Sequence, residues 1–144
     1  MRVARRVAEQ PASSQGDGKF AVLRRARRVW AVSAIHGDVE RLTALHDALA
    51  LKFQDGDRLV YTGNYLGRGS AITATLDELL AFRRDIIARP LAFASDVVYL
   101  RGSQEEMWEK LLQLQFAVDP RNVLDWILGQ GVAETIRAYG CDPD

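Results

Sequence analysis

Three short segments hold the residues of this 144-residue chain that are best suited to chemistry. Each contains glycine and follows an apolar run, and they lie at residues 36–37, 63–69 and 101–105. His36 in the first segment can bind a metal or exchange a proton. Arg68 in the second and Arg101 in the third carry guanidinium groups, which can hold a phosphate. Because ligands of α/β proteins usually bind at the carboxyl ends of strands, we expect any site to lie where these segments meet.

Each segment separates a predicted strand from a predicted helix. Short apolar runs that end near glycine predict three buried strands, at 29–34, 58–62 and 97–100. Helical spacing of apolar residues predicts five helices, at 39–52, 71–88, 105–116, 122–128 and 132–139. Strands that alternate with crossover helices predict an α/β fold with a parallel sheet and right-handed connections. All three segments then lie at one edge of the sheet.

The apolar stripes of the first two helices predict the core. They comprise Leu42, Leu45, Leu49 and Phe53 in the first helix, and Ile72, Leu76, Leu79, Leu80 and Ile86 in the second. Asp38 is placed to cap the first helix, an interpretation that we prefer to a replacement metal ligand beside His36. His46 lies in the middle of the same helix, so we expect it to be structural or exposed rather than catalytic.

Charge divides the chain into a basic arm, residues 1–27, and an acidic body, residues 28–144. Residues 1–28 contain eight Lys and Arg against two acidic residues, although the formal net charge of the whole chain is zero. The stretch 10–18 is typical of a linker, so we expect the arm to be flexible. Residues 1–28 are the only candidate for binding nucleic acid, and we do not expect them to bind it because no aromatic residues alternate with the arginines. An organelle transit peptide is a further alternative.

Other classes of protein lack support in the sequence. We expect no membrane span, because no apolar run is long enough, and no secretory signal, because no apolar core follows the first arginines. The single cysteine, Cys141, excludes an internal disulfide and indicates a reducing, cytoplasmic environment.

Together the three segments resemble the calcineurin-like metallophosphatase family, in particular its bacterial phosphoprotein-phosphatase branch. That family carries Gly-Asp-x-His-Gly, Gly-Asp-x-x-Asp-Arg-Gly and Gly-Asn-His-Glu in this order. The matching segments here are Ser33-Ala-Ile-His-Gly37, Gly63-Asn-Tyr-Leu-Gly-Arg-Gly69 and Gly102-Ser-Gln-Glu105. The flanking stretches 58–63, 97–102 and 126–140 are also similar, so that the resemblance covers about residues 28–140.

The resemblance implies a two-metal phosphoesterase site most of whose ligands are replaced. At the positions of the family's acidic, amide and imidazole groups stand Ala34, Asn64, Gly67, Ser103 and Gln104. Only His36 and, weakly, Asn64 remain as metal-ligand candidates, and Arg68 and Arg101 remain as phosphate-binding candidates. For His36 a hydrogen bond to a neighbouring backbone group is the alternative to metal binding, and for Arg68 an ion pair with a carboxylate such as Glu105 is the alternative.

We therefore expect a pseudophosphatase that binds or regulates another protein, with no catalytic residue and no cofactor. The alternative is a weakly active metal-dependent phosphoesterase with two divalent metals (manganese, iron or zinc), whose missing ligands come from another chain or a longer natural protein. The chain resembles only the N-terminal half of a metallophosphatase domain. The sheet of such a half-domain would have an uncovered apolar face. We accordingly expect a homo-oligomer or a protein partner that covers the sheet.

Overall fold

The computed structural model describes residues 20–143 and has an α/β fold. Strands β1 (Arg28–Val32), β2 (Asp57–Tyr61) and β3 (Val97–Tyr99) form a parallel sheet in the order β1-β2-β3. In the register of the sheet, Trp30 lies beside Leu59, which lies beside Val97. The predicted fold class and the order of its elements are thus confirmed.

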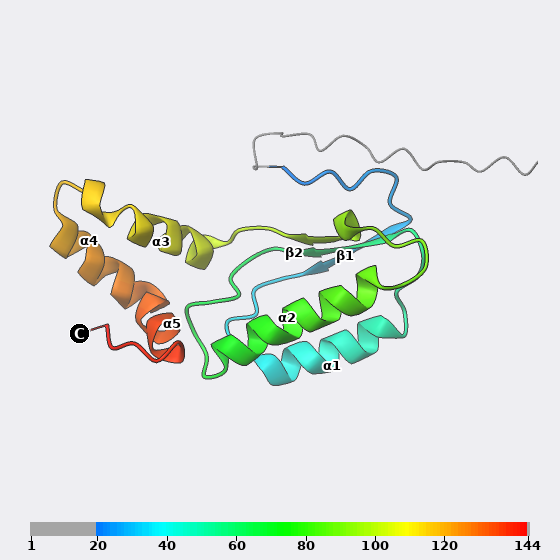
Figure 1. Cartoon of the computed structure of the whole chain (residues 1–144), viewed down its shortest axis with the longest axis horizontal. Helices are drawn as coiled ribbons and strands as arrows, with labels where there is room; N and C mark the ends of the chain where they lie inside the picture. The colour runs from blue at the N-terminus through cyan, green and yellow to red at the C-terminus, as the bar shows by residue number, and fades with distance from the viewer. Residues whose placement is uncertain (1–19, 144) are drawn as a thin grey trace, which may run out of the picture.

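Helices α1 (Val39–Ala50) and α2 (Ile72–Ile87) cover one side of the sheet (Figure 1). The strand residues that pack with them alternate along each strand, as a pleated sheet requires; they are Trp30, Val32, Leu59, Tyr61, Val97 and Tyr99. The helices contribute Leu42, Leu49, Leu79, Phe82 and Ile86, and Phe53 adds to the same core. Asp38 caps α1 by accepting a hydrogen bond from the backbone N–H of Arg41 (3.1 Å), as predicted.

Two of the predicted core residues are exposed. Leu45 is 42% exposed and Leu80 is 51% exposed, whereas His46 and Phe82 are buried. The sequence stripe of leucines did not fix how each helix is rotated about its axis. In the structure α1 turns the stripe Leu42–His46–Leu49 toward the sheet, which leaves Leu45 beside the unpaired edge of β1.

The other side of the sheet, here called the open side, carries no α-helix among the described residues (Figure 1). Its strand residues are Val29, Ala31, Arg58, Val60 and Val98. Residues 20–27 run along this side, where the Nε of Arg58 donates to the backbone oxygen of Leu23 (3.2 Å). The short turn η1 (Ala94–Asp96) also lies on this side, where Asp96 forms an ion pair with Arg58 (3.1 Å). The open side is therefore partly covered, by an extended stretch of chain and by η1.

Beyond the carboxyl ends of the strands lies a group of helices (Figure 1). It consists of α3 (Ser103–Leu112), the short turn η2 (Leu114–Phe116), α4 (Pro120–Ile127), the wide turn η3 (Leu128–Val132) and α5 (Ala133–Ala138). Another short turn, η1 (Ala94–Asp96), precedes β3. The chain kinks in η3 at Gly131, where φ is 109°. Glycine adopts such a positive φ readily because it has no Cβ atom. The predicted helices are present, with boundaries that differ by up to four residues.

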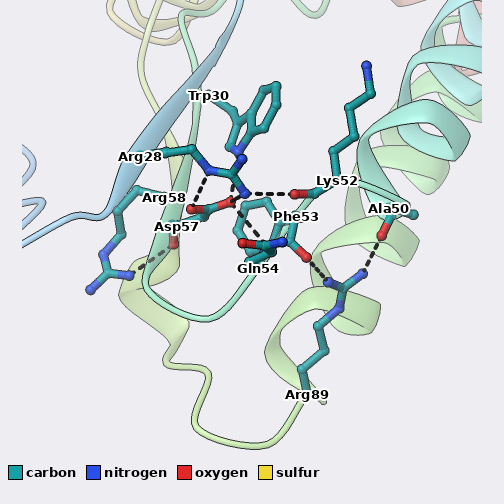
Figure 2. Close-up of polar contacts among 9 residues, drawn as sticks. All are labelled: Arg28, Trp30, Ala50, Lys52, Phe53, Gln54, Asp57, Arg58 and Arg89. Atoms are coloured by element: carbon teal, nitrogen blue, oxygen red, sulfur yellow. Dashed lines mark hydrogen bonds and ion pairs between the residues drawn. The ribbon is translucent and has the colours of Figure 1, made fainter.

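A buried carboxylate organises the opposite edge of the sheet, where the strands begin (Figure 2). Asp57 accepts hydrogen bonds from Arg28, from the indole N–H of Trp30 (3.0 Å) and from the backbone N–H of Gln54 (3.0 Å). Burial disfavours the charged carboxylate, but these donors outweigh it and lower the pKa of Asp57 to about 2. Nearby, Arg28 and Arg89 donate to backbone oxygens at the end of α1 and the turn after it.

Candidate functional site

The three glycine-containing segments meet, as predicted, and their glycines are needed for the contact. A Cβ atom on Gly63, where φ is 97°, would lie 2.1 Å from the backbone nitrogen of Gly102. A Cβ atom on Gly69, where φ is 94°, would lie 2.1 Å from the backbone oxygen of His36. Both distances are too short for any side chain. The backbones of the three segments therefore touch because glycine stands at these points.

His36 lies at the first segment, half-buried, with a φ of 51°. Its backbone N–H donates to the backbone oxygen of Asn64 (2.9 Å), and so does that of Ile35 (3.1 Å). The ring nitrogen Nδ1 lies 3.4 Å from the backbone oxygen of Leu66, a long contact. Main-chain hydrogen bonds thus position His36, and its ring makes the backbone contact that was one of the two alternatives.

Asn64, in the second segment, turns its side chain toward α3. Its Oδ1 accepts from the backbone N–H of Gln104 (3.0 Å) and from the hydroxyl of Ser103 (3.0 Å). Both donors belong to the first turn of α3, where backbone N–H groups lack partners within the helix. Asn64 therefore caps α3 from a segment that lies about 40 residues earlier in the chain.

Glu105 uses its carboxylate to hold the second and third segments together. It accepts three backbone hydrogen bonds, from the N–H groups of Asn64 (2.7 Å), Tyr65 (2.9 Å) and Gly102 (2.8 Å). Arg68, the alternative partner of this carboxylate, is exposed instead. Arg101, which precedes α3, forms an ion pair with Glu109 in the second turn of that helix. The two phosphate-binding candidates thus have different surroundings: one lies open to solvent and the other is paired.

Gln104 fills the space beside Gly67. A Cβ atom on Gly67 would lie 1.9 Å from the Oε1 of Gln104, so a residue other than glycine here would require the glutamine to move. The Nε2 of Gln104 donates to the backbone oxygen of Gln130 (2.8 Å), and the N–H of Gly67 donates to the hydroxyl of Thr135 (3.0 Å). The first bond ties η3 to the third segment, and the second ties α5 to the second segment. Thr135 was not predicted as a site residue, although it lies within the flanking stretch 126–140.

An open hollow of about 570 Å³ lies at the first segment, between the N-termini of α1 and α2. Its lining includes Ala34, His36 and Gly69, and the ion pair of Arg41 with Asp38 (3.3 Å) lies at its margin. Ala34 contributes only a methyl group where the resemblance implies a carboxylate ligand. Within residues 20–143, no three His, Cys, Asp or Glu side chains gather closely enough to hold a metal ion together.

We compared the chain with models of protein families, with curated proteins and with solved structures. No match was found. Among residues 20–143, no helix is both long and apolar enough to cross a membrane. The geometry of the three segments therefore carries the functional argument.

The second histidine, His46, lies in the core and not at the three segments. Its Nδ1 is 2.6 Å from the carboxylate of Glu78, its Nε2 is 2.7 Å from the hydroxyl of Tyr61, and its ring stacks on Phe82. Burial lowers the pKa of His46, and the hydrogen bond to Glu78 opposes that shift. His46 therefore links α1, β2 and α2 in a structural role.

Proposed function

We propose that this chain is a metallophosphatase-like module that has lost catalysis and acts by binding another protein. One observation carries the proposal: polar side chains where the three segments meet are used to hold those segments together. Asn64 caps α3, Gln104 binds η3, and Glu105 binds three backbone N–H groups. Side chains that bind the protein's own backbone in this way are not arranged to hold a metal or to transfer a proton.

A two-metal site does not fit these residues. Metal pairs in phosphoesterases require anionic oxygen and imidazole ligands, including a carboxylate that bridges both ions. The bridging position holds Asn64, whose Oδ1 already accepts from two donors of α3, and the first carboxylate position holds Ala34. His36 alone supplies an imidazole. We therefore derive no reaction step through a metal.

The experiment is to titrate manganese into the full chain by calorimetry and to measure hydrolysis of a generic aryl phosphate with manganese present. We expect no stoichiometric metal binding and no turnover above that of the buffer. The control is His36→Ala, which removes the one remaining imidazole. Stoichiometric binding, or turnover that this variant abolishes, would overturn the proposal in favour of a weakly active phosphoesterase.

A further inference from the structure

Three hydrogen-bonded side chains form a line through the core between the helices and the sheet. His46 of α1 lies in the middle, where its Nδ1 is 2.6 Å from the Oε1 of Glu78 on α2 and its Nε2 is 2.7 Å from the hydroxyl of Tyr61 on β2. His46 is 2% exposed and Tyr61 is 0% exposed, whereas the side chain of Glu78 is 25% exposed. The line therefore begins deep in the core at Tyr61 and ends near the surface at Glu78.

The chemistry of the two ends of the line determines where its protons lie. An ionised carboxylate only accepts hydrogen bonds, so the Nδ1 of His46 must carry a proton that it donates to Glu78. The neutral ring then has a lone pair on Nε2, which accepts from the hydroxyl of Tyr61. Both ring nitrogens and the tyrosine hydroxyl have a partner in this arrangement. A neutral His46 therefore fits its surroundings and leaves no polar atom of the ring unpaired.

A second proton on the ring does not fit in the same way. The protonated Nε2 would have to donate to the hydroxyl oxygen of Tyr61, whose own O–H would then need another acceptor. Among residues 20–143, no group other than His46 forms a hydrogen bond with that hydroxyl, and the ring of Tyr61 is stacked on Tyr99 with 5.1 Å between the centroids. A buried hydroxyl without a partner costs free energy. The hydrogen bonds of the core therefore favour the neutral ring.

The charged groups that act on His46 are two carboxylates. Glu78 on α2 and Asp47 on α1 both favour the charged ring, and Glu78 has the larger effect because it is hydrogen-bonded to the ring. The titratable groups on the sheet are Tyr61 and, stacked behind it, Tyr99. Burial outweighs both carboxylates and lowers the pKa of His46 below its usual value of 6.5. The unfolded chain therefore binds a proton at His46 more readily than the folded chain does.

We propose that His46, Glu78 and Tyr61 form a pH-sensitive link, which stabilises the packing of α1 and α2 on the sheet at neutral pH and weakens it in mild acid. Because folding lowers the pKa of His46, the stabilisation is complete above pH 6.5 and is lost as the pH falls below that value. Asp57 acts in a separate range, since its usual pKa is 3.8. The link goes beyond the binding role proposed above and does not depend on it.

Nuclear magnetic resonance of the full chain tests where the protons lie. The chain has two histidines, so labelling histidine with nitrogen-15 gives two rings to follow, and His36→Gln identifies the signals of His46. We expect a neutral His46 ring with its proton on Nδ1 at about pH 7.5 and titration only below pH 6.5. Glu78→Gln removes a charge that favours the protonated ring, so His46 should then titrate at a still lower pH. The matched control, Asp77→Asn at an exposed position of α2, should leave the titration unchanged.

Unfolding in urea tests the pH dependence of the link. Between about pH 7.5 and about pH 5.5, the equilibrium constant for unfolding of the wild type should rise by up to about 10-fold, because the unfolded state binds the extra proton more tightly. His46→Gln should abolish this rise, and the control His36→Gln should keep it. A rise that survives in His46→Gln, or no rise in the wild type, overturns the proposal. So does a His46 ring that is charged, or protonated on Nε2 alone, at about pH 7.5, a result that the wild type gives even if His46→Gln does not fold.

Discussion

Glu105 shows how one side chain can fix the meeting point of distant segments. Its carboxylate accepts three hydrogen bonds from backbone N–H groups that belong to two different segments. Hydrogen bonds to a charged acceptor are stronger than neutral ones, and an N–H group that loses its partner in a half-buried place costs free energy. A residue that the sequence presents as a possible ion-pair partner of Arg68 is, in the structure, a clamp between two segments.

Replacing Glu105 with Gln should therefore destabilise the fold. We expect the free energy of unfolding to fall by about 1.5–3 kcal/mol, because the amide offers one neutral acceptor oxygen in place of a charged carboxylate. Urea unfolding followed by circular dichroism measures the change. The matched control is Glu106→Gln, an exposed neighbour, for which we expect a change within about 0.5 kcal/mol. Equal effects of the two substitutions would contradict the clamp.

At the scale of elements, the sheet is held by different interactions at its two ends. Where the strands end, glycines allow the three segments to touch and polar side chains bind backbone groups across them. Where the strands begin, the buried carboxylate of Asp57 joins β1 to β2 through Arg28 and Trp30 (Figure 2). Because the second arrangement lowers the pKa of Asp57, it makes the stability of the sheet depend on pH.

Asp57→Asn should lower stability in a manner that depends on pH. The folded-state pKa of about 2 lies below the usual value of 3.8, so the folded state binds the proton more weakly than the unfolded state does. The stabilisation is therefore present above pH 3.8 and is lost as the pH falls toward 2. We expect the gap in unfolding free energy between the wild type and the variant to shrink by about 2 kcal/mol over this range.

Urea unfolding at a series of pH values measures that gap. The control is Asp85→Asn, because Asp85 is exposed on α2 and makes no ion pair with the described residues. The free energy of unfolding of Asp85→Asn should stay close to that of the wild type at every pH. A gap for Asp57→Asn that does not change with pH would show that the carboxylate acts by shape alone.

At the scale of the whole molecule, the two sides of the sheet are unequal. Helices α1 and α2 cover one side, while residues 20–27 and the short turn η1 lie along the other (Figure 1). Apolar side chains on the covered side contribute to folding, and those that project from the open side contribute nothing to it while they remain exposed. An exposed apolar side chain on the open side should therefore contribute much less to folding than a buried one on the covered side.

Phe20→Ser and Leu59→Ala test this division. We expect the free energy of unfolding of Phe20→Ser to stay within about 0.5 kcal/mol of the wild type, because the side chain is 86% exposed. Leu59 lies on the covered side and is 0% exposed, so Leu59→Ala should lower the free energy of unfolding by about 2–5 kcal/mol. Urea unfolding measures both changes, and equal losses for the two variants would contradict the division.

The sequence by itself determined the α/β fold, the order of its elements and the meeting of the three segments. It did so because apolar runs, glycines and helical spacing are local signals, and because the carboxyl ends of parallel strands share one edge. Only the tertiary structure decided what the side chains bind. Asn64, Gln104 and Glu105 contact groups 3 to 41 residues away, and Thr135 contacts Gly67 across 68 residues. Helical spacing likewise could not place His46 in the core and Leu45 outside it, because the rotation of α1 depends on the sheet beneath it.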